Sequence, residues 1–180
     1  MVDGSKGLLK AITNVFKGHA LTQRCQWHKR ENVIGYLPKG EQTKFRRKLQ
    51  AAYEKLTYAE AREALRKIQG ELRLINQSAA ASLEEGLEET LTLHRLGLFE
   101  KLGASFKTTN VIESIQARIG QYTDKVDYWR NSDQKQRWVA SALLDLEPRL
   151  NRVKGMKYLS ELRRAIQRDL GIKNEEQIAA

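Results

Sequence analysis

The sequence predicts a predominantly α-helical protein with a partial α/β element at its N-terminal end. Only two prolines, Pro38 and Pro148, interrupt the 180 residues, and apolar residues recur at helical spacing through most of the chain. The β-strand signal is confined to the N-terminal end. A sheet with so few strands could not stand alone, because its backbone groups and one apolar face would stay unpaired. We therefore expect an incomplete α/β core attached to a larger helical part.

The N-terminal element is expected to run strand, turn, helix, strand. Residues 1–2 have the character of a strand end, and residues 7–16 show helical spacing with Leu8, Leu9, Ile12 and Phe16 directed inward. Residues 21–27 have limited β character and are the candidate for the second strand. Asp3 would then lie between a strand and a helix, where α/β folds expose functional groups. A simple helix N-cap is the alternative interpretation of Asp3.

The rest of the chain predicts amphipathic helices. Thr57 with Glu60, and Ser82 with Glu85, have the spacing of capping boxes and so predict two helix starts. Gly97 is the expected stop of the helix that follows the second box. The apolar stripes are Phe45, Leu49, Ala52 and Leu56; Ala61, Leu65, Ile68, Leu72 and Ile75; Leu83, Leu87 and Leu91; Ile112, Ile115, Ile119 and Tyr122; residues 138–146; and Leu159, Leu162, Ile166 and Leu170.

Composition favours a polyanionic partner. Lys and Arg total 32 against 22 Asp and Glu, which gives a net charge of +10. Each phosphate that Lys or Arg neutralises releases a condensed counterion, so such an excess favours nucleic acid. A single cysteine excludes an internal disulfide framework and suits a reducing cytoplasm. No apolar run approaches the roughly 20 residues of a membrane-spanning helix, so we expect a soluble cytoplasmic protein without a membrane partner.

Cys25 and His28 form a C-x-x-H pair at the end of the second candidate strand. A structural zinc site would need four ligands, and only His19 and His94 could be added to the pair. The competing interpretation makes Cys25 a small core residue and His28 a hydrogen-bonding partner near the strand end.

Asn110 and Glu113 begin the helix that carries the stripe from Ile112 to Tyr122. Their N-cap and N3 spacing is that of a capping box, which would explain Glu113 without any catalysis. The neighbouring positions on that face are small or polar, so Glu113 could instead border a cleft. The sequence pattern alone leaves both interpretations open.

Taken together and in order, these motifs resemble the mutator-type bacterial transposases and the related plant mutator elements. The resemblance covers nearly the whole chain, and the combined pattern is far more specific than any single motif. It continues through Trp129, Arg137 and Trp138 to the basic C-terminal helix. The matching motif residues are Asp3, Gly4, Gly7, Leu8, Ala11 and Ile12; Gln23, Arg24, Cys25, His28, Lys29, Arg30, Asn32 and Val33; Leu37 and Pro38; and Thr108, Thr109, Asn110, Ile112, Glu113 and Ser114.

The resemblance implies an incomplete ribonuclease-H-like core interrupted by an all-helical insertion. In that family two aspartates and a glutamate hold two Mg²⁺ or Mn²⁺ ions for phosphodiester cleavage and strand transfer. Asp3 matches the second aspartate and Glu113 the glutamate, so their carboxylates are expected within roughly 10 Å of each other. The implied divisions are 1–38 for the partial core, 39–105 for the insertion, 106–125 for the glutamate helix, and 126–180 for a basic helical region.

The first aspartate of the family should precede Asp3, and this chain has no residues there. The chain therefore resembles a truncated C-terminal fragment of a transposase, expected to be inactive alone. The whole enzyme is expected to bind DNA, both transposon ends and target, as a homodimer or higher oligomer. The alternative is a non-catalytic helical DNA-binding module derived from a transposase, with Asp3 and Glu113 as caps.

Basic residues supply the candidates for DNA contact. Three of them, Arg24, Lys29 and Arg30, surround the C-x-x-H pair. Four others belong to the basic C-terminal segment, which could position DNA through its phosphates: Arg149, Arg152, Arg163 and Arg164. Trp129 and Trp138 could stack on an unpaired base or pack in a core.

Overall fold

The computed structural model describes residues 1–172. The chain divides into two compact units. Unit 1 joins Met1–Thr108 to the chain from Lys154 onward, and unit 2 is Thr109–Val153. The predicted insertion, residues 39–105, therefore lies wholly within unit 1, whereas the predicted C-terminal region, residues 126–180, contributes to both units.

The fold is predominantly helical, as the sequence predicts. No helix among residues 1–172 is long and apolar enough to cross a membrane. The α-helices of unit 1 are α1 (Lys6–Phe16), α2 (Gln26–Gly35), α3 (Lys39–Tyr53), α4 (Tyr58–Ile75), α5 (Gln77–Glu84), α6 (Leu87–Thr90), α7 (Thr92–Arg95), α8 (Phe99–Phe106) and α11 (Leu159–Asp169). Those of unit 2 are α9 (Asn110–Thr123) and α10 (Ser132–Leu146).

The expected strand over residues 21–27 is wrong. The described residues contain one isolated parallel bridge, between Val2 and Arg24, and no strand. The amide of Cys25 donates to the carbonyl of Val2 at 2.8 Å, while the amide of Arg24 donates to Glu89 at 2.9 Å. Because Glu89 in the helical turn Leu87–Thr90 occupies the other edge of residues 23–25, no β-ladder can extend there. The helix α2 then begins at Gln26. Residues 1–172 thus show neither the partial α/β element nor a ribonuclease-H-like core.

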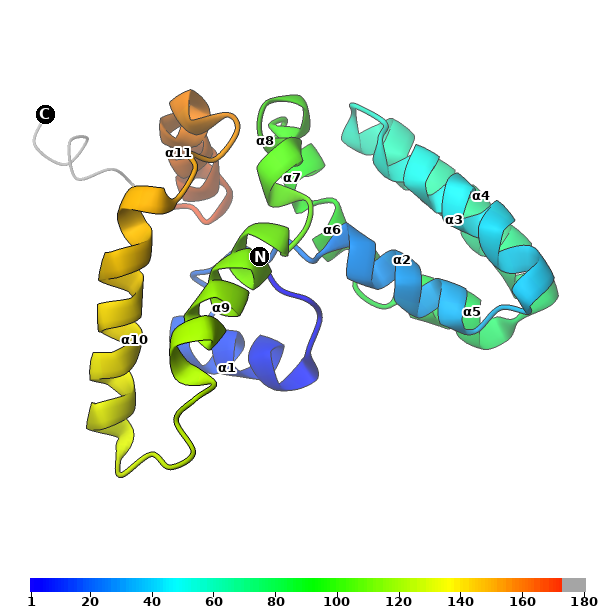
Figure 1. Ribbon diagram of the computed structural model, residues 1–180. Helices are drawn as coiled ribbons and strands as arrows, with labels where there is room; N and C mark the ends of the chain where they lie inside the picture. Colours follow the sequence, from blue (N-terminus) through cyan, green and yellow to red (C-terminus); the bar gives the residue numbers. More distant parts are fainter. Residues whose placement is uncertain (173–180) are drawn as a thin grey trace, which may run out of the picture. The chain divides into compact units, whose positions relative to one another are not determined.

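The main core of unit 1 lies among α2, α3, α4 and α5. In Figure 1, α3 and α4 form a long antiparallel pair, and α5 returns along α2. The predicted stripes of α3 and α4 are buried in this core, apart from Leu56 and Ile75 at their ends, which are exposed. Each fully buried leucine stabilises the fold by about 1.5–3 kcal/mol. The principal buried residues are Val33, Phe45, Leu49, Leu65, Leu72, Leu83 and Leu91.

Of the helix starts predicted at Thr57 and Ser82, the first forms. The Thr57 hydroxyl accepts from the amide of Glu60 at 3.3 Å and donates to its carboxylate at 2.6 Å, which starts α4. The second predicted start, at Ser82, is wrong: α5 begins at Gln77 and is capped by Asn76, whose side chain accepts from the amide of Ala79 at 2.9 Å. Asn76 caps earlier, so Ser82 falls inside a helix that is already formed.

The predicted apolar helix beyond Ser82 is interrupted at Gly86, which has a φ of 73°. This left-handed turn ends α5 and redirects the chain into the short helices α6 and α7. Gly97, with a φ of 69°, ends this segment as expected. The chain then enters a second, smaller core that brings α7, α8 and α11 together: Leu93, Leu98, Phe99, Leu102 and Ala165.

The face of α1 that was expected to point inward is only partly covered. Leu8 and Phe16 are about half exposed, at 46% and 50%. Among the described residues of unit 1, no helix packs broadly against α1. Helical spacing therefore located this helix correctly but did not specify a partner for its apolar face.

Unit 2 is a pair of helices. Asn131 caps α10 by accepting from the amide of Gln134 at 2.8 Å. The hydroxyl of Tyr122, on α9, donates to Asp145 on α10, and Arg149 donates to the same hydroxyl at 2.9 Å. The predicted helices over the stripes in this region are thus confirmed, and polar contacts join them.

Candidate catalytic and DNA-binding residues

Asp3 lies in an exposed turn immediately after the bridge formed by Val2. Its Oδ1 accepts a hydrogen bond from the amide of Ser5 at 2.8 Å. The N-cap position of α1 is Ser5, so the interpretation of Asp3 as the cap itself is wrong. A carboxylate that is exposed and held by a single local amide can accept further ligands.

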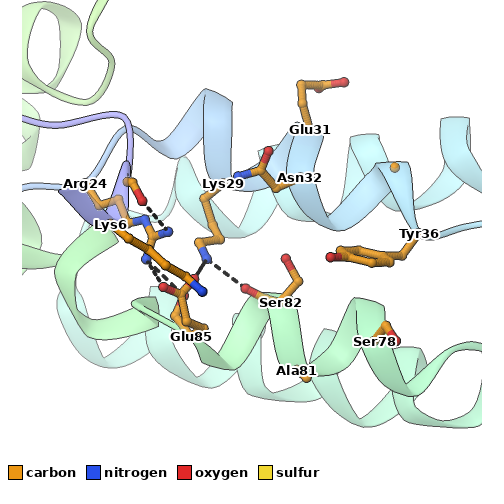
Figure 2. Close-up of a pocket in the computed structure, with 12 residues that line it drawn as sticks. Lys6, Arg24, Lys29, Glu31, Asn32, Tyr36, Ser78, Ala81, Ser82 and Glu85 are labelled. Atoms are coloured by element: carbon orange, nitrogen blue, oxygen red, sulfur yellow. Dashed lines mark hydrogen bonds and ion pairs between the residues drawn. The ribbon is translucent and has the colours of Figure 1, made fainter. Parts of the chain in front are cut away.

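Arg24 lies behind this turn and is 4% exposed. Its Nη2 donates to the carbonyl of Gly4 at 3.4 Å, and its Nη1 donates to the carboxylate of Glu85 at 2.9 Å. The guanidinium thus bridges the Asp3–Gly4 turn and the end of α5. Figure 2 shows Arg24 and Lys29 converging on Glu85 from two directions.

Lys29 is the second buried cation, at 1% exposure. Its Nζ donates to the carbonyl of Ser82 at 2.8 Å and to the carboxylate of Glu85 at 2.6 Å, and it also contacts the Glu85 carbonyl. Burial lowers the pKa of Lys29. The hydrogen bond from Arg24, reinforced by Lys29, lowers the pKa of Glu85 to about 2.

The role of Glu85 was not predicted. The sequence suggested Glu85 only as part of a capping box, and its partners Arg24 and Lys29 lie 61 and 56 positions away. No local spacing links such distant residues. Arg24 and Lys29 were predicted to contact DNA, and that stays a prediction; in the structure both side chains bind Glu85. Arg30, the third candidate of this group, donates to Glu31 at 2.9 Å and to Gln50 at 2.5 Å.

A pocket of about 770 Å³ lies beside this ion cluster, between α2 and α5. Figure 2 shows polar side chains from both helices around it. Its lining combines cations, carboxylates, hydroxyls and an amide, so it suits a polar ligand rather than an apolar one. The residues around it are Gly4, Lys6, Arg24, Lys29, Glu31, Asn32, Gly35, Tyr36, Ser78, Ala81, Ser82 and Glu85.

Cys25 and His28 belong to the start of α2 rather than to a strand. Cys25 is the N-cap residue, 1% exposed, so its interpretation as a small core residue is confirmed. The ring of His28 meets the ring of Trp27 edge-on, with centroids 4.9 Å apart. The ring of His94, a candidate zinc ligand, stacks on the ring of Phe99 with centroids 3.7 Å apart. Within residues 1–172, no three His, Cys, Asp or Glu side chains form a group that could hold a metal ion.

Glu113 is exposed in the first turn of α9, in unit 2. The N-cap of this helix is Thr109, so the assignment of Asn110 as the cap is wrong by one residue. The hydroxyl of Thr109 donates to the carboxylate of Glu113, and the carbonyl of Thr109 accepts from the Glu113 amide at 3.0 Å. Asp3 lies in unit 1, and the approach of its carboxylate to Glu113 stays a prediction.

The four C-terminal arginines divide between the units. Arg149 belongs to unit 2, where its guanidinium binds Asp145 and Tyr122, and Arg152 is exposed nearby in the same unit. Arg163 and Arg164 lie exposed on α11 of unit 1. Their contact with DNA stays a prediction. Trp129 and Trp138 pack edge to face in unit 2, with ring centroids 6.2 Å apart, and Trp138 remains 43% exposed.

Comparison with known proteins places these residues in a family. Residues 1–151 match the family model for transposases of the Mutator family, a span that includes both Asp3 and Glu113. The chain is 27% identical over 148 residues to the transposase for insertion sequence element IS256 in transposon Tn4001, from Staphylococcus aureus and from Enterococcus faecalis. This match covers 80% of the chain but 36% of each relative. No solved structure matches the chain significantly. The chain belongs to the Mutator family of transposases.

Proposed function

We propose that this chain carries the second catalytic aspartate, Asp3, and the catalytic glutamate, Glu113, of a transposase that cuts and joins DNA. The observation that carries this proposal is the family match over residues 1–151, which contains both carboxylates. Both side chains are exposed and lie beside the start of a helix, at α1 and α9.

The chemistry of the two side chains fits a hard divalent cation. Mg²⁺ and Mn²⁺ prefer oxygen ligands, which Asp3 and Glu113 supply and a buried thiol such as Cys25 does not. When bound, the ions would activate the attacking oxygen and stabilise the leaving oxygen in a phosphodiester displacement. Asp3 and Glu113 would hold them, with one Oδ of Asp3 already oriented by the Ser5 amide. The remaining ligands of such a site would come from outside this pair.

The whole enzyme is proposed to have a ribonuclease-H-like core and to act on transposon ends and target DNA in the cytoplasm, as a homodimer or higher oligomer. The chain spans about a third of the length of the curated relatives that it matches, 36% of each. DNA cleavage by the chain alone is therefore a poor test of the roles of Asp3 and Glu113, because no cleavage would be expected whether or not the two carboxylates are catalytic.

Metal binding gives a direct test. A Mn²⁺ titration of the chain should broaden the backbone amide NMR signals of Ser5 and Ser114 over the same range of concentration, because one metal cluster would lie near both. Asp3→Asn should weaken the broadening at Ser114, and Glu113→Gln should weaken it at Ser5. In each case the substituted residue and the affected amide belong to different units. The loss of a surface charge next to the amide would therefore not explain the change in broadening.

The matched control is Asp127→Asn, which removes an exposed carboxylate from unit 2 at a position outside the family motifs. It should leave both signals broadened as in the unmodified chain. If Asp3→Asn does not alter the broadening at Ser114, or if Asp127→Asn has the same effect, Asp3 and Glu113 do not share a metal site. The non-catalytic DNA-binding module would then be the better description of the chain.

A further inference from the structure

We propose that Arg24 is a positioning residue for Asp3. Its guanidinium lies between the turns at Gly4 and Gly86. It attaches the turn that carries Asp3 to the end of α5. The catalytic importance of this arrangement rests on the proposed function of Asp3, whereas the mechanical link between the two turns does not. Arg24 immediately precedes the C-x-x-H pair formed by Cys25 and His28.

The backbones of Gly4 and Gly86 both approach the Arg24 side chain closely. A Cβ atom added at Gly4 would overlap the Nε, Nη2 and Cζ of Arg24, and one added at Gly86 would overlap its Nη1. Gly4 and Gly86 also have φ values of 100° and 73°, which other residues rarely adopt. The guanidinium therefore fills a slot that exists only because both turns lack side chains.

Arg24 is held both at its backbone and at its side chain. Its own backbone is fixed by the bridge to Val2 and by the 2.9 Å hydrogen bond from its amide to the carbonyl of Glu89. Its side chain donates to the carbonyl of Gly4 at one edge and to the carboxylate of Glu85 at the other; Figure 2 shows the contact with Glu85. The Arg24 side chain thus links the turn at Gly4 to the end of α5.

The chemistry of the guanidinium suits this position. Its donors lie on separate nitrogens, so it reaches the Gly4 carbonyl from one edge and the Glu85 carboxylate from another, whereas the ammonium of lysine donates from a single atom. Its buried charge is compensated by Glu85, which also pairs with Lys29, and by Glu89 at 3.8 Å. The Nε of Arg24 has no hydrogen-bond partner among the described residues, so the group is not placed there by optimal hydrogen bonding alone. Its position is best explained by the two turns that it joins.

The decisive experiment compares two glycine substitutions with the same backbone cost. Gly86→Ala and Gly97→Ala each place a Cβ at a similar positive φ, 73° and 69°, but only the first meets Arg24; at Gly97 the space is open. Gly86→Ala should accelerate amide exchange at Ser5 by roughly tenfold or more, 81 residues away in sequence, while Gly97→Ala leaves it unchanged. Global stability of both variants is measured by urea unfolding, so that the comparison is made between equally folded proteins.

Two further variants test the pathway through Arg24. In an Arg24→Ala chain, adding Gly86→Ala should have no further effect on exchange at Ser5, because the side chain that transmits it is gone. Gly4→Ala should reproduce the effect of Gly86→Ala from the opposite side of the guanidinium. If Arg24→Ala does not fold, the comparison of the glycine variants still decides the matter, and equal effects of Gly86→Ala and Gly97→Ala at Ser5 overturn the proposal.

Broadening of the Ser5 signal by Mn²⁺ is a second measurement, which would not change if Arg24 only stabilised the fold. Gly86→Ala should weaken Mn²⁺ broadening at Ser5 at unchanged global stability, whereas Gly97→Ala should not. If Asp3→Asn does not alter the broadening, the metal assignment of Asp3 fails, yet the exchange comparison still tests the mechanical link. If Asp3→Asn abolishes the broadening but Gly86→Ala does not weaken it, Asp3 binds metal without positioning by Arg24, and the proposal is wrong.

Discussion

The ammonium group of Lys29 lies 2.6 Å from the carboxylate of Glu85, although the two residues are 56 positions apart. Arg24 donates to the other oxygen of the same carboxylate at 2.9 Å. The half-exposed Glu85 therefore pairs with two buried cations, and Glu89 lies 3.8 Å from Arg24 as a second acid. Removing the Glu85 charge leaves the buried Arg24 and Lys29 with less compensation, which makes Glu85 a sensitive position for stability.

Glu85→Gln should destabilise the chain at neutral pH by about 1–3 kcal/mol, because charge-assisted hydrogen bonds to Arg24 and Lys29 are lost. The pKa of Glu85 is lowered from 4.5 to about 2 in the folded chain, so its contribution is present above pH 4.5 and is lost as pH falls toward 2. The difference in unfolding free energy between the two proteins should therefore shrink over this range in urea titrations. Glu100→Gln, at an exposed position of α8, is the control and should show no such difference.

His94 should make stability depend on pH in a separate range. Its Nε2 lies 3.0 Å from the carbonyl of Lys55, and burial lowers its pKa below the ordinary value of 6.5. The unfolded chain then takes up a proton before the folded chain does, so stability present above pH 6.5 is lost as pH falls below it. Thermal unfolding between about pH 7 and pH 5 should show a decline that His94→Gln reduces and His19→Gln does not. An unchanged decline in His94→Gln would contradict this assignment.

The core between α3 and α4 should carry much of the stability of unit 1. Leu49 is 0% exposed, and its truncation to alanine should cost about 2–5 kcal/mol through lost burial and a residual cavity. Leu74→Ala removes the same atoms from a side chain that is 89% exposed and should change stability by less than about 0.5 kcal/mol. Urea unfolding of the two variants measures the contrast directly. Similar losses would mean that this core is not formed in solution.

Hydrogen exchange should separate α1 from α4. The amphipathic face of α1 has no buried residue in the described structure, whereas α4 buries Ala61, Leu65, Ile68, Gln69 and Leu72. Segments with little buried apolar surface open locally at low free energy. The amides of α1 should therefore exchange well before those of α4, and equal protection of the two helices would show that α1 is covered in solution.

Arg163 and Arg164 offer the clearest test of DNA contact, because both are exposed on α11. Replacing both by alanine should weaken binding to unrelated duplexes and reduce the log-log salt slope by about two units if each contacts a phosphate. The control, Arg66→Ala with Arg73→Ala, removes equal charge from exposed positions of α4. Equal effects of the two double variants would indicate a general charge effect rather than a phosphate-contacting face.

Helical spacing predicted the main core well. Phe45, Leu49 and Ala52 on α3, and Leu65 and Leu72 on α4, were expected on inward faces and are buried. This information is local, because residues three and four positions apart share one face of any helix wherever that helix packs. The cap at Thr57 was predictable for the same reason, since its partner lies only three positions away.

Motif order, read as a family resemblance, identified the family to which the chain belongs; the catalytic roles of Asp3 and Glu113 stay predictions. The strand expected over residues 21–27 failed because strand formation depends on a partner. Here the amide of Arg24 bonds to Glu89, and Gln23 bonds to the carbonyl of Thr90 at 2.9 Å. β-Propensity specifies neither of those partners.

The sequence by itself determined the longer helices α3 and α4 and their inward faces. Only the tertiary structure decided what surrounds them. Arg24 and Lys29 looked like surface cations for DNA, yet the path of the chain through α5 and the turn at Gly86 brings Glu85 between them. Whether a charged side chain is buried depends on residues some 60 positions away, because compensation of its charge requires a partner in space and not in sequence.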